Sequence, residues 1–332
     1  MIKVAVIGLG WWGRHMVKCL QSGDSGFDLV RVVDVNLDGA KDFAAEKNVP
    51  LSGDYQDVLD DADVDAVILT TPQQTHEDQI VAGAAAGKHV FCEKPLTMTK
   101  AGAERAVAAC NDAGVQLGVG HERRFERALV EIRDLVKKGD LGTIMHVECN
   151  SSHDKLKDLK ADDWRVQQSI GPSVPMTGMG VHMTDLYVDM FGKLESIYAV
   201  KTSRVVDHEG GDVVAIQLNF ESGMTGSISC ITVTPFFYRY QVFGSEGWAQ
   251  AIDSAHPDDT SSISTLTTCF KAGEINTKEF TWSDTVTANL KAFAAAVEGR
   301  ADYPFSDEQK INNVGAMEAI VKSIKSGNVE QV

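Results

Sequence analysis

A glycine pattern near the amino terminus, GLGWWG, limits the possible folds of this chain more than any other feature. It follows a β-branched run from Val4 to Gly8 and precedes a segment of helical composition from Trp12 to Ser22. In such a turn the glycines allow a tight bend, close approach of the backbone to a pyrophosphate, and close packing of the helix on the strand. Amide groups at the helix start then donate hydrogen bonds to phosphates. We therefore predict a dinucleotide-binding turn made of Gly8, Leu9, Gly10, Trp11, Trp12 and Gly13.

The residue that indicates which dinucleotide binds is Asp34, at the end of a second strand-like segment from Leu29 to Asp34. A carboxylate in this place, about 20 residues after the glycines, accepts hydrogen bonds from a ribose 2′-hydroxyl and repels a 2′-phosphate. Residues 35–38 offer no arginine to hold that phosphate. We expect NAD rather than NADP. The alternatives are a glycine turn with a purely structural role and an ordinary turn aspartate.

Residues 1–120 alternate short β-branched runs with helical segments, which is typical of parallel strands joined by crossover helices. Helices are expected over Trp12–Ser22 and Gln79–Ala86, with Thr75 and Asp78 as a helix-capping signal for the second. The predicted strands are Val4–Gly8, Leu29–Asp34, Ala66–Thr70, His89–Glu93 and Gln116–Gly120.

The pattern changes after Arg124, where strand-like segments outnumber helices. This favours an α+β domain with an open-faced, mostly antiparallel sheet. Residues 253–264 and 273–277 are polar and turn-rich, so we expect hairpin connections or loops there. The predicted strands are Ile144–Asn150, Ile197–Thr202, Val213–Phe220, Thr225–Thr232 and Arg239–Gly244, and the predicted helices are Ala128–Lys138, Val286–Glu298 and Asp307–Ser326.

Together these patterns predict an α/β protein of two domains. We expect residues 1–122 to form a doubly wound, parallel Rossmann domain that binds NAD, and residues 123–332 to form an α+β domain that holds the substrate. The last helix is expected to be able to pack back on the first domain.

Charge and composition exclude several classes of function. A net charge of −16 repels nucleic acid unless basic residues cluster, and the densest basic cluster is Arg123, Arg124 and Arg127. Every apolar run is interrupted well before the roughly 20 residues needed to cross a bilayer. With no export signal visible, we expect a cytoplasmic protein without a membrane or nucleic-acid partner. The six cysteines form no C-x-x-C pair and no metal motif is present, so we expect reduced thiols and no metal.

Two loops should lie at the carboxyl edge of the predicted parallel sheet, where α/β folds bind ligands. Thr71 and Pro72 end one strand, with His76 just beyond, and Glu93 and Lys94 end the next. A positively charged nicotinamide lowers the pKa of a neighbouring lysine, which can then donate or accept a proton. The following proline restricts the backbone of Lys94 and helps to hold it in place. The alternative is a solvated surface lysine.

Four segments, GLGWWG, TPQQTH, AGKHVFCEKPLTMTKAGAE and GVHMTDL, resemble the glucose-fructose oxidoreductase/inositol dehydrogenase/rhizopine catabolism (Gfo/Idh/MocA) family over nearly the whole chain. The resemblance implies a Rossmann domain, an open-faced sheet domain that often pairs sheet to sheet in homodimers or homotetramers, and hydride transfer with a sugar or polyol. It implies that Lys94 is catalytic and contacts the nicotinamide ribose and the substrate hydroxyl.

The segment GPSVPMTGMGVHMTDLY is similar to the family's active-site helix, which puts His182 at the acid/base position. Histidine titrates near physiological pH and can take a hydroxyl proton as hydride leaves. The alternative is a packed helix histidine bonded to Asp185 or to a carbonyl. The chain departs from the family pattern at Gly178, where many members carry aspartate, and at residues 172–174, which replace a glycine triplet.

Further residues are candidates for substrate binding because the departures leave room for other contacts. The residues that could compensate for the changed positions are His153, Asp154, Arg165 and Thr177, and the alternative for each is a surface or packing role. His121 and Arg123 follow a strand end and could face the cleft, with a solvated basic turn as the alternative. With the two catalytic candidates, the predicted substrate-binding set is Lys94, His121, Arg123, His153, Trp164, Arg165, Thr177 and His182.

The function that follows is NAD-dependent hydride transfer involving a secondary alcohol or hemiacetal carbon of a sugar, polyol or sugar-like substrate. Lys94 and His182 are the expected catalytic residues. Two alternatives stay open, a regulator that senses a dinucleotide or sugar without chemistry, and a reductase of a C=N or C=C bond.

Overall fold

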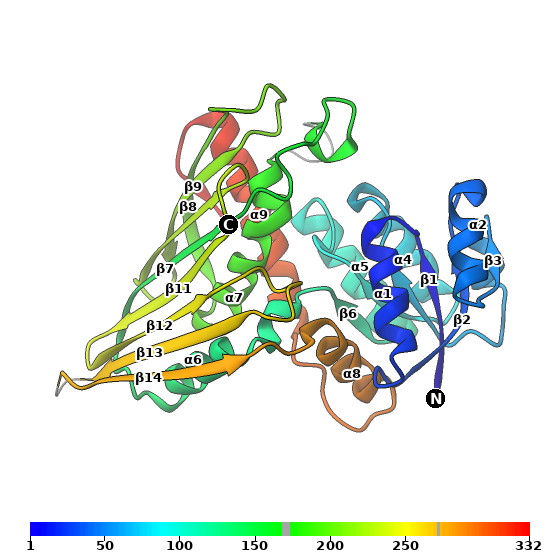
Figure 1. Ribbon diagram of the computed structural model, residues 1–332, viewed down its shortest axis with the longest axis horizontal. Coiled ribbons are helices and arrows are strands. Elements are labelled where there is room, and N and C mark those ends of the chain that lie inside the picture. The colour runs from blue at the N-terminus through cyan, green and yellow to red at the C-terminus, as the bar shows by residue number, and fades with distance from the viewer. Residues whose placement is uncertain (168–172, 271–272) are drawn as a thin grey trace. The chain divides into compact units, whose positions relative to one another are not determined.

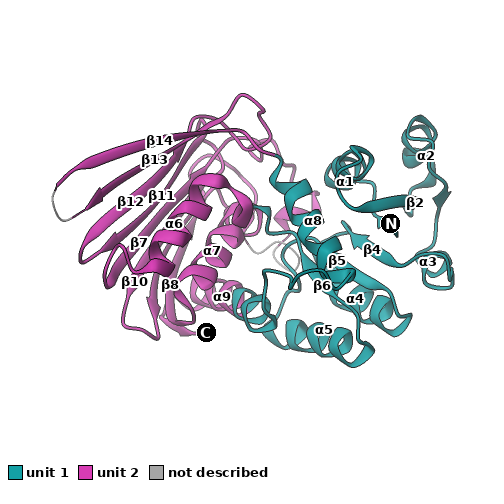
Figure 2. Ribbon diagram, turned by 90° about the horizontal axis from the view of Figure 1, so that it is seen from below, with its two compact units in different colours: residues 1–122, 284–314 teal, residues 123–283, 315–332 magenta. Residues whose placement is uncertain are grey.

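Two sheets organise the residues that the computed structural model describes, which are 1–167, 173–270 and 273–332 (Figure 1). The chain divides into two compact units (Figure 2). Unit 1 comprises residues 1–122 and 284–314, and unit 2 comprises residues 123–283 and 315–332.

The sheet of unit 1 is parallel, with strand order β3-β2-β1-β4-β5-β6. Its central strand Ala66–Leu69 is buried at all four positions, as expected for a strand covered on both faces. The predicted doubly wound sheet is therefore confirmed. The strands are β1 (Ile2–Ile7), β2 (Phe27–Val33), β3 (Leu51–Ser52), β4 (Ala66–Leu69), β5 (His89–Cys92) and β6 (Leu117–Val119).

Helices cover both faces of this sheet, α1, α2 and α8 on one and α4 and α5 on the other (Figure 2). Side-chain caps begin three of them. Asn36 accepts a hydrogen bond from Gly39 N, Thr99 accepts one from Gly102 N, and Asp284 accepts one from Thr287 N. Thr75 is the N-cap residue of α4, as the sequence indicated, but its side chain makes no capping hydrogen bond and its hydroxyl donates to Pro72 O at 2.8 Å. The helices are α1 (Trp11–Gln21), α2 (Leu37–Glu46), α3 (Gln56–Leu59), α4 (His76–Ala85), α5 (Lys100–Ala113) and α8 (Thr285–Val297).

We expected a second domain of residues 123–332 from which only the last helix could pack back on the first. Residues 284–314, which include all of α8 and the start of that last helix, belong to unit 1. The cause is apolar burial by α8. Phe293 is fully buried, with its ring 5.9 Å from that of Phe27 and 5.5 Å from that of Phe91. Tyr303 adds a hydrogen bond to the carbonyl of Val119 at 3.1 Å.

Unit 2 contains a nine-stranded sheet of order β14-β13-β12-β11-β7-β10-β9-β8-β15. All of its pairs are antiparallel except β7 with β10, which confirms the mostly antiparallel sheet. The strands are β7 (Ile144–Ser152), β8 (Leu194–Thr202), β9 (Val213–Phe220), β10 (Thr225–Ile231), β11 (Phe237–Gly244), β12 (Gly247–Asp253), β13 (Ile263–Phe270), β14 (Ile275–Thr281) and β15 (Glu330–Gln331).

Four of these strands, β12, β13, β14 and β15, were not predicted. Residues 275–277 belong to β14, although we expected a hairpin connection or loop over 273–277. The sequence of β14, INTKEFT, shows little apolar alternation, and only Phe280 is buried. Main-chain pairing with β13 makes this segment a strand, and local sequence does not report such pairing.

Helices α6 (Arg127–Lys138), α7 (Val181–Phe191) and α9 (Asp307–Ser326) carry apolar side chains into the core of unit 2, and α9 begins in unit 1. Strand residues alternate, for example in β9, where every second position is buried. The opposite side of the sheet exposes Tyr198, Val200 and Ile252. None of the helices in the described ranges has the length and apolar character needed to span a membrane.

We predict that Phe293→Ala lowers the free energy of unfolding by about 3–5 kcal/mol, because it removes a fully buried ring from contacts with two others. Phe237, which is 46% exposed, is the matched control, and Phe237→Ala should cost less than about 1 kcal/mol. Urea denaturation of both variants measures the difference. Equal losses would contradict the packing of α8 in unit 1.

Candidate functional site

The glycine turn of unit 1 joins β1, which ends at Ile7, to α1, which begins at Trp11. Gly8 has a φ of +95°, a conformation that L side chains rarely adopt. A β-carbon at Gly13 would overlap the carbonyl oxygen of Gly8, whereas one at Gly10 would meet no atom within 4 Å. The turn therefore needs glycine at 8 and 13 for its own packing, while the space around Gly10 leaves its backbone open to a ligand.

Asp34 lies at the end of β2 with its carboxylate bound to two backbone amides. Oδ2 accepts a hydrogen bond from Leu9 N at 2.6 Å, and Oδ1 accepts one from Asn36 N at 2.8 Å. These contacts hold the carboxylate beside the glycine turn. Each carboxylate oxygen has a further lone pair, so Asp34 can still accept hydrogen bonds from a ribose hydroxyl.

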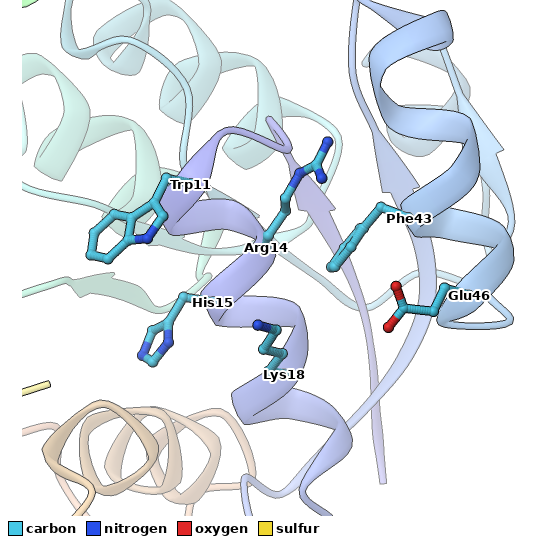
Figure 3. Close-up of a pocket in the computed structure, with 6 residues that line it drawn as sticks. All are labelled: Trp11, Arg14, His15, Lys18, Phe43 and Glu46. Carbon is cyan, nitrogen blue, oxygen red and sulfur yellow. The ribbon is translucent and has the colours of Figure 1, made fainter. Parts of the chain in front are cut away.

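A pocket between α1 and α2 is lined by aromatic and charged side chains, namely Trp11, Arg14, His15, Lys18, Phe43 and Glu46 (Figure 3). Trp11 is 68% exposed, and its ring is stacked 6.5 Å from that of His15. Arg14 donates to Leu9 O at 3.0 Å and to Gly39 O at 2.7 Å. Arg14, which directly follows the glycine motif in the sequence, was not among the predicted site residues; the expectation of no phosphate-binding arginine rested on residues 35–38.

His76 is buried between the two loops expected at the carboxyl edge of the sheet. Its Nδ1 lies 2.9 Å from Pro95 O and its Nε2 lies 3.0 Å from Thr71 O. Burial lowers the pKa of this imidazole, so the neutral form is favoured. The ring thus ties the Thr71–Pro72 loop to the loop that carries Lys94.

Glu93 and Lys94 directly follow β5, with Lys94 half-buried and its peptide bond to Pro95 cis. Glu93 is only 5% exposed, and its Oε2 accepts a hydrogen bond from Lys94 N at 3.1 Å. Burial, followed by the nearby charge of Glu122, raises the pKa of Glu93 to about 7. A β-carbon at Gly120 would overlap this carboxylate, so glycine there leaves the space that the carboxylate occupies.

Unit 1 therefore contains all of the predicted cofactor-binding residues, on segments that follow the parallel strands. Strands β1 and β4 are neighbours from which the strand order runs in opposite directions, and such a switch point is where doubly wound sheets bind ligands. The segments that follow β1, β2, β4 and β5 contribute Gly8, Leu9, Gly10, Trp11, Trp12, Gly13, Asp34, Thr71, Pro72, His76, Glu93 and Lys94.

His121 and the two arginines after it are buried in interactions within their own units. Asn313 Nδ2 lies 3.0 Å from His121 Nε2 in unit 1. In unit 2, Arg123 binds Glu126 at 2.6 Å and lies 5.1 Å from the ring centroid of Tyr238. These contacts give both predicted substrate-binding residues a packing role.

His182 lies in the first turn of α7 and is 6% exposed. A π-helical turn, Met176–Gly180, precedes it. Asp185, one turn further along, accepts two hydrogen bonds from the guanidinium of Arg124, at 2.7 Å and 2.6 Å. Arg124 also binds Asp189 at 3.2 Å, so buried charge pairs hold α7 and the backbone of His182 in place.

The other predicted substrate residues of unit 2 lie on loops and turns. His153 follows β7 with its ring 5.1 Å from that of His256, and burial together with the charge of His256 lowers the pKa of His153 to about 4. Arg165 binds Asp163 at 2.8 Å, beside the ring of Trp164.

Thr177, in the π-helical turn, donates from its hydroxyl to Ser173 O at 3.0 Å. At Gly178, a β-carbon would come within 2.8 Å of the Leu156 side chain. Pro172, part of the segment that departs from the family pattern, lies outside the described residues.

Two family models match this chain. Residues 2–121 match the description "Oxidoreductase family, NAD-binding Rossmann fold", and residues 129–250 match "GFO/IDH/MocA C-terminal domain". Myo-inositol 2-dehydrogenase of Thermotoga maritima is 31% identical over 255 residues, which cover 74% of each chain. The 1,5-anhydro-D-fructose reductase of Ensifer adhaerens is 26% identical over 93% of this chain and 92% of its own.

Solved structures share the fold at lower identity. A levoglucosan dehydrogenase in complex with NADH and levoglucosan superposes with a TM-score of 0.84 at 19% identity, covering 100% of this chain and 99% of that one.

Substitutions at Gly10 and at Gly13 should have different effects on stability and on NADH binding. Gly10→Ala should leave the melting temperature nearly unchanged, because its β-carbon meets no protein atom, but it should weaken NADH binding at least about 10-fold. Gly13→Ala should lower the melting temperature, because its β-carbon overlaps the Gly8 carbonyl. Thermal denaturation and NADH fluorescence titration measure both effects. Full NADH affinity in Gly10→Ala would contradict pyrophosphate binding at this turn.

Proposed function

The chain belongs to the Gfo/Idh/MocA oxidoreductase family, and we propose that it is an NAD-dependent dehydrogenase of a sugar, polyol or sugar-like substrate. The observation that carries the proposal is the position of Lys94. It follows β5 in the same parallel sheet whose β1 leads into the glycine turn, and β4 alone separates the two strands. A lysine there has the chemistry to bind a hydroxyl next to a nicotinamide.

The residues of unit 1 fit a dinucleotide. The open space at Gly10 suits a pyrophosphate, and the exposed start of α1 offers backbone amides to it. Asp34, held by Leu9 N and Asn36 N, suits a ribose with free hydroxyls and disfavours a 2′-phosphate. Arg14 is a cation close to the glycine turn and would favour NADP by binding a 2′-phosphate, but its guanidinium already donates hydrogen bonds to two backbone carbonyls. We therefore propose NAD rather than NADP.

In the proposed reaction, Lys94 and His182 act on one hydroxyl group of the substrate. Lys94 donates a hydrogen bond to the hydroxyl oxygen and stabilises its developing negative charge. His182 takes the hydroxyl proton as the carbon loses a hydride. A bound nicotinamide supplies the hydride acceptor, and the reverse direction uses the same groups.

The substrate class rests on the relatives. Their names specify myo-inositol, 1,5-anhydro-D-fructose and levoglucosan, which all carry several hydroxyl groups on a ring. We propose that His153, Trp164, Arg165 and Thr177 contribute to recognition of such a ring. His121 and Arg123 support the site from buried positions.

Unit 1 is the proposed NAD-binding domain and unit 2 the proposed substrate domain. We further propose that the exposed side of the nine-stranded sheet joins copies of the chain into a homodimer or homotetramer. Ile252 is exposed there beside Arg239, which pairs with Glu148, and Tyr198 and Val200 are exposed on β8, further along the sheet. This mixture of apolar and charged groups is typical of subunit interfaces.

A screen of sugars, polyols and sugar acids with NAD and NADP tests the proposal directly. We expect at least one neutral polyhydroxy compound to reduce NAD, followed by the absorbance of reduced nicotinamide. The ratio kcat/KM should favour NAD over NADP by about 10-fold or more, because Asp34 repels the 2′-phosphate. NADH binding without turnover of any compound would instead favour a regulator.

Lys94→Met should lower kcat by about 100- to 10,000-fold while NADH affinity changes little, because methionine keeps the shape of the side chain but cannot bind a hydroxyl. Lys41→Met is the matched control, since Lys41 lies on α2 with its side chain 63% exposed. Steady-state kinetics and NADH titration separate the two effects. Turnover retained by Lys94→Met would refute the catalytic assignment.

A further inference from the structure

Glu93 is a buried carboxyl group that the proposed reaction does not use. It is 5% exposed and lies next to Lys94 in sequence and in space. One of its oxygens, Oε2, binds the backbone N–H of Lys94. The other, Oε1, has no hydrogen-bond partner among the described residues. A buried acceptor without a hydrogen-bond partner loses the hydration free energy of that atom and lowers stability, so a functional reason for a carboxylate at this position is worth testing.

The surroundings of Glu93 are built around its carboxylate. Gly120, at the end of β6, leaves the room that a β-carbon would take from it. The indole Nε1 of Trp12, at the start of α1, is buried near the same carboxylate and lowers its pKa. Within the described part of the chain, this N–H lies beyond hydrogen-bond distance of any acceptor. Glu93 thus lies between the glycine turn, the end of β6 and the backbone of Lys94.

Three titratable groups face Glu93 in the described residues. Glu122 raises its pKa by like-charge repulsion, and Lys94 lowers it by attraction. The third is Cys92 on β5, whose buried thiol has a pKa well above its ordinary value and therefore stays neutral. The net result, dominated by burial, is a carboxyl whose pKa is raised to about 7. Its charge therefore changes near neutral pH.

We propose that Glu93 is a positioning residue for Lys94. Its carboxylate holds the Lys94 backbone through the N–H, and its charge keeps the Lys94 amine protonated, while Glu93 itself remains out of contact with substrate. Attraction between opposite charges acts equally on both partners, so the lysine that favours ionised Glu93 is itself held in the ammonium form. Protonation of Glu93 removes this support. Lys94 therefore loses its proton more easily when Glu93 is protonated than when Glu93 is ionised.

The coupling has a consequence for stability. The folded-state pKa of Glu93 is raised, so the folded protein binds a proton that the unfolded chain has released. This contribution to stability is present below the unfolded pKa and is lost as the pH rises through about 7. The side chain in Glu93→Gln carries no charge at either pH. The melting temperature of Glu93→Gln minus that of the wild type should therefore be larger at pH 8 than at pH 5.

The deciding experiment measures the reactivity of Lys94 itself. Trace labelling with acetic anhydride across a pH series, with mass spectrometry of the peptides, reports how much of each lysine is unprotonated. In Glu93→Gln, the half-maximal labelling of Lys94 should move to lower pH by about one unit. Lys41 serves as the internal standard, and its curve should stay unchanged. The matched control Glu77→Gln removes a carboxylate on α4 that binds Arg105, and it should leave Lys94 as in the wild type.

Glu93→Asp keeps the charge but withdraws it by one methylene, so its Lys94 curve should fall between the wild type and Glu93→Gln. Wild-type labelling curves for Lys94 in both Glu93 variants would overturn the proposal, and the Glu93→Asp result alone decides it if Glu93→Gln does not fold. A purely structural role for Glu93 would lower stability in both variants without moving the labelling curve.

The pH dependence of kcat/KM gives a second readout, in which an inflection near pH 7 should be present in the wild type and absent from Glu93→Gln. This inference rests on the proposed role of Lys94, but the labelling needs neither cofactor nor substrate. Full turnover in Lys94→Met would refute that role and leave the coupling between Glu93 and Lys94 intact. An unmoved labelling curve would refute the coupling alone.

Discussion

The close approach of backbone to backbone at the glycine turn is the constraint on which the organisation of unit 1 depends. Gly13 packs so near the carbonyl of Gly8 that no side chain fits between them, and Gly8 in turn lies against Thr70 at the end of β4. This packing sets α1 directly on the sheet beside the switch point between β1 and β4. The strand ends that carry Asp34, Thr71 and Lys94 are arranged around that point.

Buried polar groups then hold the catalytic candidates. His76 spans two carbonyls on either side of the site, and Glu93 binds the backbone of Lys94. In unit 2, Arg124 binds Asp185 and thereby the helix that carries His182. Such groups cost desolvation free energy, which their hydrogen bonds offset only when the geometry is good. Both units use this kind of interaction next to the residues proposed to perform the chemistry.

The comparison of sequence with structure separates local from non-local information. The glycine turn, the parallel strands and the helix Asp307–Ser326 could be predicted because periodicity and turn residues report them locally. Strand β14 could not, because its partner β13 supplies the pairing. Arg14 was missed because its contact with Gly39 joins two helices that are separated in sequence. The burial of His121 against Asn313 likewise depends on residues 284–314, which return to unit 1 from far along the sequence.

The amino-acid sequence alone was enough to identify the dinucleotide-binding motif, the acidic residue after β2, the family resemblance and the lysine after β5, because each depends on residue type at a short spacing. Folding in three dimensions decided which of these groups are buried, which are charged and which are already bound. Glu93 is the clearest case. Its raised pKa arises from burial and from the charge of Glu122, and the residues that flank Glu93 in the sequence indicate neither cause.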